Sequence, residues 1–298
     1  MTKQNPKTLI ILPCHAIYTP QKEVTELSPE YLPTPETPGP GTSQADWQLV
    51  SFQLESQDQI SFLHHIYESL KVLQTDLQNS TLIISGGFTK KQIERSESES
   101  YLKCAQDRGL ISSELKNSKD KILLEECARD SFENVLFSLA LYKSKFGYYP
   151  DRITIVGFEF KRYRFMNQHL KVLQFPETNI EYIGIGPIYP SQEHFGISDL
   201  KEYELKKKAF FDDLVNCEDK FAVQLFDLNP FGSLGSKLHA KKEVRDPFGK
   251  EGDIEKKYVL DGSNDQALNE MVKLDKLVYD DAMKVYNEKC KDKFSWCN

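Results

Sequence analysis

The stretch KILLEECARDSFENVLFSLALY, from Lys121 to Tyr142, contains in one piece the alternation that decides the fold. Its first apolar residues, Ile122 to Leu124, are typical of a buried strand, and the apolar residues from Phe132 onward recur at helical spacing. A buried strand that passes directly into an amphipathic helix is the repeating unit of proteins built on a parallel β-sheet. The stretch therefore predicts an α/β fold.

The same alternation recurs along the first two thirds of the chain. Strands are predicted at residues 8–13, 80–85, 121–126, 152–157 and 180–186. Helices are predicted at residues 46–77, with one break, and at 96–108, 131–146 and 161–173. Right-handed crossovers between successive strands place helices on both faces of the sheet. We therefore expect a three-layer α/β sandwich around a mainly parallel sheet of five or more strands.

The composition limits the kinds of function. The chain has 298 residues, of which 39% are hydrophobic and 28% are charged, so it can bury a sizeable core. The formal net charge of −7 and the pI near 5.5 argue against binding to nucleic acid, since such proteins usually carry a basic face. The apolar run at residues 8–13 is shorter than a signal-peptide core and far shorter than a membrane span. We expect a soluble protein without a nucleic-acid or membrane partner.

The six cysteines indicate the cellular compartment. They form no CxxC pair, and no His and Cys residues have the spacing of a zinc site. Without a secretory signal, such cysteines are typical of reduced thiols in the cytosol. We expect a cytoplasmic protein without a structural metal.

The alternation of strands and helices ends after residue 186, which indicates that the chain has two parts. An α/β domain is predicted at residues 1–190, and an extension that packs on it is predicted at 191–298. A proline-rich insertion at 19–45, with six prolines, is expected to be a disordered loop or a lid over the ligand edge.

The extension is expected to hold helices at residues 198–217 and 264–285. It also contains two Asx-Pro-Phe-Gly turns, at 229–232 and 246–249, with a basic segment between them. That segment is predicted to be a solvated hairpin or loop, and the alternative is a flap that closes on a site.

Unusual turns follow the predicted strands. Because the carboxyl ends of parallel strands share one edge of a sheet, the turns after them meet where ligands usually bind. The turns hold Cys14 and His15, then residues 85–87, then 125–131, and finally 157–164. The sequence therefore predicts that these four segments lie close together.

Two of these turns have features that suit an anionic ligand. Gly86 and Gly87 allow a sharp turn that exposes backbone amides, although an ordinary tight turn would use the same residues. Three cations, Lys161, Arg162 and Arg164, stand in the first turn of a predicted helix, where the helix dipole favours acids. A phosphate or carboxylate bound between them would explain this placement, and a solvated first turn is the alternative.

The charged junction of the opening stretch has more polar residues than a helix start requires. Asp130 and Glu133 form a capping pattern. Glu125 ends an apolar strand, where a carboxylate must meet solvent, a cation or a donor. Glu125 and Arg129 form either a structural ion pair or, with Asn134, part of a ligand site.

For three further polar residues, a structural role is compared with a role in a site. Ser96 is predicted to cap a helix, which leaves Glu97 without a structural task. His169 lies among apolar residues and is expected to face the core rather than to act as a catalyst.

Three motifs in order resemble those of the domain of unknown function 218 family (DUF218; YdcF, SanA and ElyC-like proteins). They are Ser85-Gly86-Gly87, then Ser96-Glu97-x-Glu99, and then Glu125-x-x-x-Arg129-Asp130-Ser131-x-Glu133-Asn134. The family motifs run approximately SGG, SEAE and E-x-x-S-R-N-T-x-E-N, so Ala128, Asp130 and Ser131 replace the family's Ser, Asn and Thr. The match covers residues 8–186. The chain as a whole resembles a fungal-type cytosolic member of this family.

The resemblance implies a Rossmann-like sheet with a polar pocket. Arg164 takes the position of a family arginine, whereas Lys161 stands where the family has a histidine. His15 is expected to occupy similar space from the turn after the first strand. A YdcF-type member is associated with S-adenosylmethionine, which the resemblance implies as one possible ligand.

The sequence therefore predicts a protein that binds an anionic small molecule, nucleotide-like or S-adenosylmethionine-like. It is either an enzyme that acts on this molecule or a non-catalytic, ligand-responsive binding module. His15 and Glu125 are the candidates for a general acid or base. The predicted ligand-binding residues are Cys14, Ser85, Gly86, Gly87, Ser96, Glu97, Arg129, Ser131, Asn134, Lys161 and Arg164.

Overall fold

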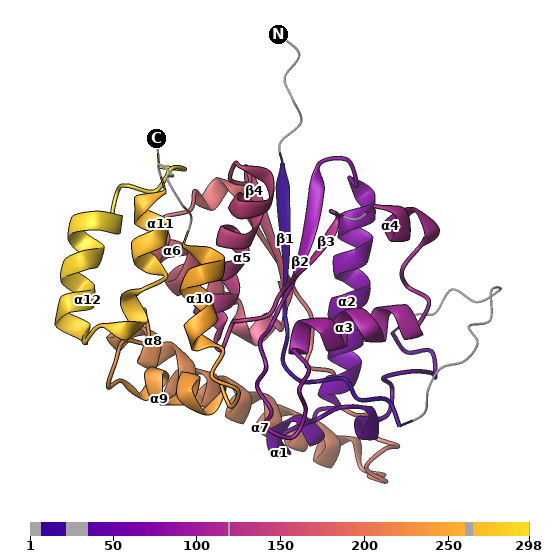
Figure 1. The fold of residues 1–298 in the computed structure, drawn as a ribbon. Coiled ribbons are helices and arrows are strands. Elements are labelled where there is room, and N and C mark those ends of the chain that lie inside the picture. Colours follow the sequence, from indigo (N-terminus) through magenta and orange to yellow (C-terminus); the bar gives the residue numbers. More distant parts are fainter. Residues whose placement is uncertain (1–6, 22–34, 119, 260–264, 298) are drawn as a thin grey trace.

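The computed structural model describes residues 7–21, 35–118, 120–259 and 265–297 of the chain. Its centre is a sheet of five strands that all run parallel, in the order β3-β2-β1-β4-β5 (Figure 1). The strands are β1 (Thr8–Pro13), β2 (Ser80–Ser85), β3 (Ile122–Glu125), β4 (Arg152–Gly157) and β5 (Ile180–Gly184). The predicted α/β fold with a parallel, five-stranded sheet is confirmed, and it is a Rossmann-like sandwich.

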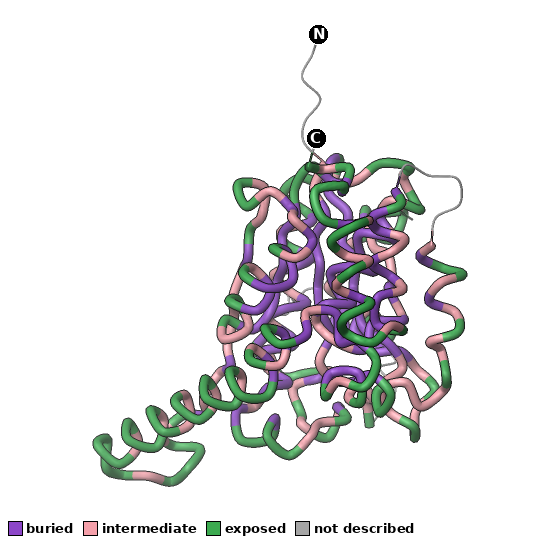
Figure 2. The backbone as a smooth tube through the Cα atoms, turned by 90° about the vertical axis from the view of Figure 1, so that its left-hand side faces the viewer, coloured by how far each residue is buried: buried purple, intermediate pink, exposed green. Residues whose placement is uncertain are grey.

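Helices cover both faces of this sheet because successive strand residues point to opposite sides. In β1, Ile10 and Leu12 belong to the core formed with α2 and α3, whereas Leu9 and Ile11 belong to the core formed with α5. The first six helices are α1 (Ser51–Leu54), α2 (Asp58–Thr75), α3 (Glu97–Asp107), α4 (Ser113–Asn117), α5 (Ser131–Phe146) and α6 (Leu170–Val172). Figure 2 shows the buried residues gathered along the strands and the inner sides of these helices.

The predicted helix starts are confirmed by their caps. The Asp130 carboxylate accepts a hydrogen bond of 2.9 Å from the amide of Glu133 at the start of α5. The Ser96 hydroxyl accepts one of 3.0 Å from the amide of Glu99 at the start of α3. Each cap satisfies an amide that the first helical turn leaves without a partner.

The helix predicted at residues 46–77 is broken, as expected. The break between α1 and α2 lies at Gln57, whose φ of 48° is left-handed. The helix predicted at 161–173 consists of η2 (Glu159–Lys161), the π-helical segment η3 (Arg164–His169) and α6.

The extension forms a helical layer outside α5. It contains α7 (Leu200–Glu218), η5 (Asp219–Val223), α8 (Gln224–Leu228), α9 (Lys237–Val244), α10 (Glu251–Tyr258), α11 (Gln266–Met271), η6 (Leu274–Lys276), α12 (Tyr279–Val285) and η7 (Tyr286–Cys290). Tyr258 of α10 stacks on Phe137 of α5, with ring centroids 4.9 Å apart, and Leu268 and Met271 of α11 join the same core. The extension therefore packs on the α/β part, as Figure 1 shows. By contrast, α7 carries only half-buried and exposed residues.

Two predictions for the extension are wrong. The helix predicted at 264–285 is divided, because Leu277 is extended (φ −99°, ψ 153°) and accepts a hydrogen bond from the amide of Leu234; residue 264 lies outside the described residues. The basic segment between the two turns is the helix α9 rather than a hairpin or loop. The Ser236 hydroxyl caps it by accepting from the amide of His239 at 3.0 Å.

The proline-rich insertion is described only in part, because residues 22–34 lie outside the described residues. Its second half packs on α3: the guanidinium of Arg108 donates to the carbonyls of Pro40 and Thr37 at 2.7 and 3.1 Å. The indole of Trp47 donates to the carbonyl of Gly41 at 2.8 Å.

In the described residues, no helix combines the length and the apolar character that crossing a bilayer requires.

Candidate functional site

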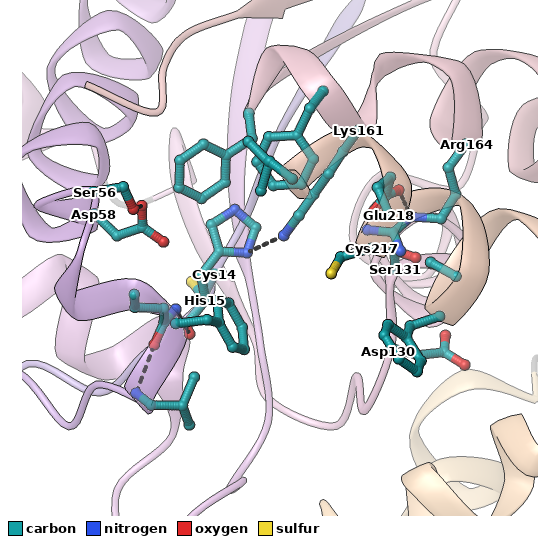
Figure 3. Close-up of a pocket in the computed structure, with 18 of the residues that line it drawn as sticks. Cys14, His15, Ser56, Asp58, Asp130, Ser131, Lys161, Arg164, Cys217 and Glu218 are labelled. Atoms are coloured by element: carbon teal, nitrogen blue, oxygen red, sulfur yellow. Dashed lines mark hydrogen bonds and ion pairs between the residues drawn. The ribbon is translucent and has the colours of Figure 1, made fainter. Parts of the chain in front are cut away.

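A cavity of about 1190 Å³ lies at the carboxyl edge of the sheet. The chain passes from β1 outward to β2 and β3, and then returns to the other side of β1 with β4. Such a reversal leaves a crevice between the turns that diverge from the two central strands. Cys14 and His15 follow β1, Lys161 follows β4, and all three line the cavity (Figure 3). Phe158, which also follows β4, lines it as well.

Lys161 is a half-buried cation that reaches into the cavity. Its Nζ lies 3.3 Å from His15 Nδ1 (Figure 3). It also lies 5.1 and 5.5 Å from the ring centroids of Phe158 and Phe160. In the described part of the chain, no carboxylate pairs with this ammonium group. Burial, followed by the nearby charge of Arg164, lowers the pKa of Lys161 to about 8.

Arg164 is buried beside the same cavity. Its Nε lies 3.3 Å from Oε1 of Glu218, which belongs to α7. Burial lowers the pKa of Arg164, and the charge of Glu218 opposes this shift. A guanidinium stays charged nonetheless, so Arg164 is a fixed cation that joins the sheet edge to α7.

His15 has one ring nitrogen in contact with Lys161 and one without a partner. Burial, and then the charge of Lys161, lowers the pKa of His15 well below its ordinary value, so the ring is neutral. Since Lys161 can only donate, Nδ1 is the acceptor, and the ring proton is on the buried Nε2, which contacts no acceptor. The predicted role of His15 as an acid or base stays a prediction.

Two carboxylates also line the cavity. Asp58 accepts a hydrogen bond of 2.5 Å from Ser56 Oγ (Figure 3). Glu97 accepts one of 2.5 Å from Thr89 Oγ1. Burial raises the pKa of Glu97, and it raises the pKa of Asp58 to about 6 against the opposing hydrogen bond from Ser56. Glu97, which was predicted from its lack of a structural task, is therefore a cavity residue.

Cys14, Ser131 and Asn134 also line the cavity, as the prediction requires. Burial raises the pKa of the Cys14 thiol well above its ordinary value, so the thiol is protonated. The amide nitrogen of Asn134 donates to the carbonyl and hydroxyl oxygens of Ser85 at 3.1 and 2.9 Å. Asn134 thereby fixes the start of α5 to the end of β2.

The glycine turn does not supply ligand-binding amides, which corrects the prediction for Gly86 and Gly87. The amide of Gly86 donates to the carbonyl of Glu125, and the amide of Gly87 donates to the carbonyl of Ala128, each at 2.9 Å. A Cβ on Gly86 would lie 2.8 Å from the Cβ of Cys14. The glycines are required because neighbouring turns approach closely there.

Ser85 and Ser96 also lie outside the cavity lining. The hydroxyl of Ser85 donates to the Glu125 carboxylate at 2.5 Å, and the hydroxyl of Ser96 donates to Glu126 Oε1 at 2.9 Å. Both serines therefore connect β2 and α3 to the turn after β3, and their predicted contact with a ligand is corrected.

Glu125 is fully buried and lies outside the cavity lining. Its carboxylate accepts hydrogen bonds from the amides of Cys127 (2.6 Å) and Ala128 (3.1 Å), and from the hydroxyl groups of Ser85 and Tyr258 (2.9 Å). Burial raises the pKa of Glu125 to about 7, although these hydrogen bonds oppose the shift. Glu125 therefore has a structural role, because it organises the turn between β3 and α5 and anchors α10.

Arg129 does not pair with Glu125, so that alternative is wrong as well. Although Arg129 borders the cavity, its guanidinium lies 2.6 Å from Glu133 Oε1 and 2.6 Å from Asp275 Oδ2. The ammonium of Lys242 lies 3.0 Å from the same oxygen of Glu133. We define the buried charge cluster as Arg129, Asp130, Glu133, Lys242 and Asp275. This cluster joins α5 to the extension, which explains why charged residues gather at the start of α5 in the opening stretch.

Several cavity residues were not predicted. They are Asp58 and Phe160 near the sheet edge, Phe210 and Glu218 of α7, Lys241 of α9 and Arg245 directly after it. The basic composition of residues 237–245 was the available signal, and Lys241 and Arg245 of this segment line the cavity. The alternative of a flap that closes on a site stays a prediction. No local pattern marked α7 as a cavity wall.

The comparisons with known proteins give one informative match. No family model matches the chain, and no solved structure matches it. The uncharacterized protein YOR238W of Saccharomyces cerevisiae (strain ATCC 204508 / S288c) is 30% identical over 275 residues, which cover 81% of this chain and 84% of the yeast protein. The match thus spans about four fifths of the chain, which is more than the α/β part alone. The chain belongs to the same protein family as this yeast protein.

Proposed function

We propose that the protein binds an anionic small molecule in the cavity, with a phosphate or carboxylate group next to Lys161 and Arg164. The ligand is nucleotide-like or S-adenosylmethionine-like, with a planar part that lies against aromatic side chains. We also propose that the family of this chain is of the DUF218 type and that the protein is located in the cytoplasm. The six free cysteines support that compartment.

The observation that carries this proposal is the state of Lys161. Removing an ammonium group from water costs free energy unless an anion or several acceptors replace the water. In the described residues its contacts are a neutral imidazole and two phenyl rings, and burial, followed by the charge of Arg164, lowers its pKa against the opposing charges of Glu218 and Asp58. A bound anion would pair with Lys161 and reverse this shift.

The rest of the cavity supports a ligand with an apolar or planar portion. Aromatic side chains from several elements line it, including Phe158 and Phe160 after β4, Phe165 of η3, Phe210 of α7 and Phe226 of α8. Aromatic faces stack on planar groups and also stabilise cations. At about 1190 Å³ the cavity has room for a molecule of nucleotide size or larger.

Replacing Lys161 by methionine is expected to weaken binding of ATP, S-adenosylmethionine or pyrophosphate, whichever binds the wild type, by about 10- to 100-fold. The reason is the loss of one charge-assisted hydrogen bond of about 1.5–3 kcal/mol. The measurement is isothermal titration calorimetry. Lys171→Met is the matched control, because Lys171 is exposed on the following helix. Equal affinity of the wild type and Lys161→Met would contradict the proposal.

Binding is also expected to weaken as the pH rises above about 8. Lys161 in the free protein has a pKa of about 8, and a bound anion favours its charged form, so binding above this pH must take up a proton. Affinity should therefore fall by up to about tenfold per pH unit. Calorimetry with pyrophosphate in buffers of different ionisation enthalpy measures this proton uptake. A pH-independent affinity with no proton uptake would show that Lys161 does not face the ligand.

A further inference from the structure

Ser131 and His169 form a contact that the binding proposal does not use. Ser131 Oγ lies 2.7 Å from His169 Nε2, although the two residues are 38 positions apart in the sequence. Ser131 is half-buried and lines the cavity, whereas His169 is buried behind it. A hydroxyl that faces a cavity, with an imidazole within hydrogen-bond distance, is the arrangement of an activated nucleophile and its base.

The π-helical segment η3 explains how His169 reaches this position. Residues five apart in an α-helix are rotated by about 140° from each other. In η3 the amide of Leu170 donates to the carbonyl of Phe165, five residues back, so the turn has one more residue. With this extra residue, Arg164 lines the cavity while His169 contacts Ser131 behind it. Single π-helical turns of this kind are frequent at functional sites.

The surroundings of His169 keep its imidazole neutral. Phe132, Phe165 and Phe226 pack around the ring, with centroids 5.7, 5.4 and 4.5 Å away. Burial, and then the charges of Arg164 and Lys242, lowers the pKa of His169 well below its ordinary value. With the ring proton on Nδ1, the neutral Nε2 accepts the hydrogen bond of the Ser131 hydroxyl.

The position of Ser131 also suits a nucleophile. It is the first residue of α5, a helix of 16 residues, and follows the carboxyl end of β3. The helix dipole stabilises negative charge at this end, and Arg164 lines the same cavity as a second source of positive charge (Figure 3).

We propose that Ser131 is a catalytic nucleophile and His169 its general base, in the hydrolysis of a carboxylic ester that carries an anionic group. This inference rests on the proposed function, because the cations of the same cavity would hold that anionic group. Oγ bonds to the carbonyl carbon while its proton moves to His169 Nε2. The ester C–O bond then breaks, and the leaving alcohol takes the proton. Water, deprotonated by the same base, cleaves the acyl-serine and restores both residues.

The test treats the intact protein with an alkyl fluorophosphonate. In this reaction an Oγ–P bond forms, the P–F bond breaks, fluoride leaves and the hydroxyl proton moves to His169. Intact-protein mass spectrometry should show one adduct per chain, and tandem mass spectrometry should map it to Ser131. We expect no adduct with Ser131→Ala, retained labelling with Ser131→Thr, and a rate about 100-fold lower with His169→Gln.

Ser144→Ala is the matched control, because Ser144 is exposed on the same helix, and its labelling should equal that of the wild type. An unlabelled wild type, an adduct on another residue, or an unchanged rate with His169→Gln would overturn the inference. If Ser131→Ala fails to fold, the position of the adduct mapped in the wild type decides whether Ser131 is the nucleophile.

Pyrophosphate titration separates this inference from the proposed function. Binding of pyrophosphate without an adduct refutes the nucleophile and leaves the anion site standing. An adduct at Ser131 without binding of any anionic probe refutes the anion site and the substrate class, and supports the nucleophile.

Discussion

Replacing Lys242 by methionine is expected to lower the free energy of unfolding by about 3–5 kcal/mol, because three buried carboxylates would then share one cation. The ammonium of Lys242 lies 3.0 Å from Glu133, 3.6 Å from Asp130 and 3.9 Å from Asp275. Burial alone would raise the pKa of Glu133, but Lys242 and Arg129 hold it at about 2. The measurement is urea denaturation of the variant beside the wild type.

The control for this prediction is Lys256→Met, since the side chain of Lys256 is 79% exposed and its partner Asp253 is also solvated. Exposed ion pairs contribute about 0–1 kcal/mol, so this control should unfold almost as the wild type does. The double variant Lys242→Met with Glu133→Gln should recover part of the loss, because it removes one of the uncompensated charges. A Lys242→Met variant as stable as the control would show that the charge cluster does not hold the extension in place.

Wild-type stability is expected to fall by about 3 kcal/mol, relative to Glu125→Gln, between about pH 4.5 and pH 7. The folded-state pKa of Glu125 is about 7, above its ordinary value, so the folded protein retains a proton that the unfolded chain releases. This contribution is complete below about pH 4.5 and is lost as the pH rises through the folded-state pKa. The measurement is the free energy of unfolding from urea titrations across this pH range.

The comparison must be made with the variant, because Asp58, with a pKa of about 6, adds a pH dependence of the same sign in both proteins. Glu177→Gln, which changes an exposed carboxylate, serves as the control. Identical pH slopes for wild type and Glu125→Gln would mean that the four donors around this carboxylate outweigh its burial.

The strands, most helices and the shared edge of the turns could be predicted because their signals are local. Apolar residues recur with a period that differs between strand and helix, and caps such as Asp130 are three residues from their partners. The parallel order then brings Cys14, Ser85 and Glu125 to one edge, where Pro13, Ser85 and Glu125 are in register across neighbouring strands.

The partners of the polar residues could not be predicted, because they are distant in the sequence. Arg129 and Asp275 are separated by 146 positions, and so are His15 and Lys161. The sequence offers Glu125 only an ion pair with Arg129 or a ligand site, because Tyr258, which donates to it, is 133 positions away. The exposed helix α7 borders the cavity without a sequence pattern that distinguishes it from any solvated helix.

The buried charge cluster has a consequence for the order in which the protein can be completed during translation. When the ribosome has made the last strand, β5, the chain already contains Arg129 and Glu133, but Lys242 and Asp275 have not been synthesised. Until about sixty more residues are added, up to Lys242, the acidic start of α5 lacks the ammonium that neutralises it. All five strands are therefore synthesised well before the residues that neutralise the buried charges at the start of α5. The stability of the nascent α/β part thus depends on the last third of the chain.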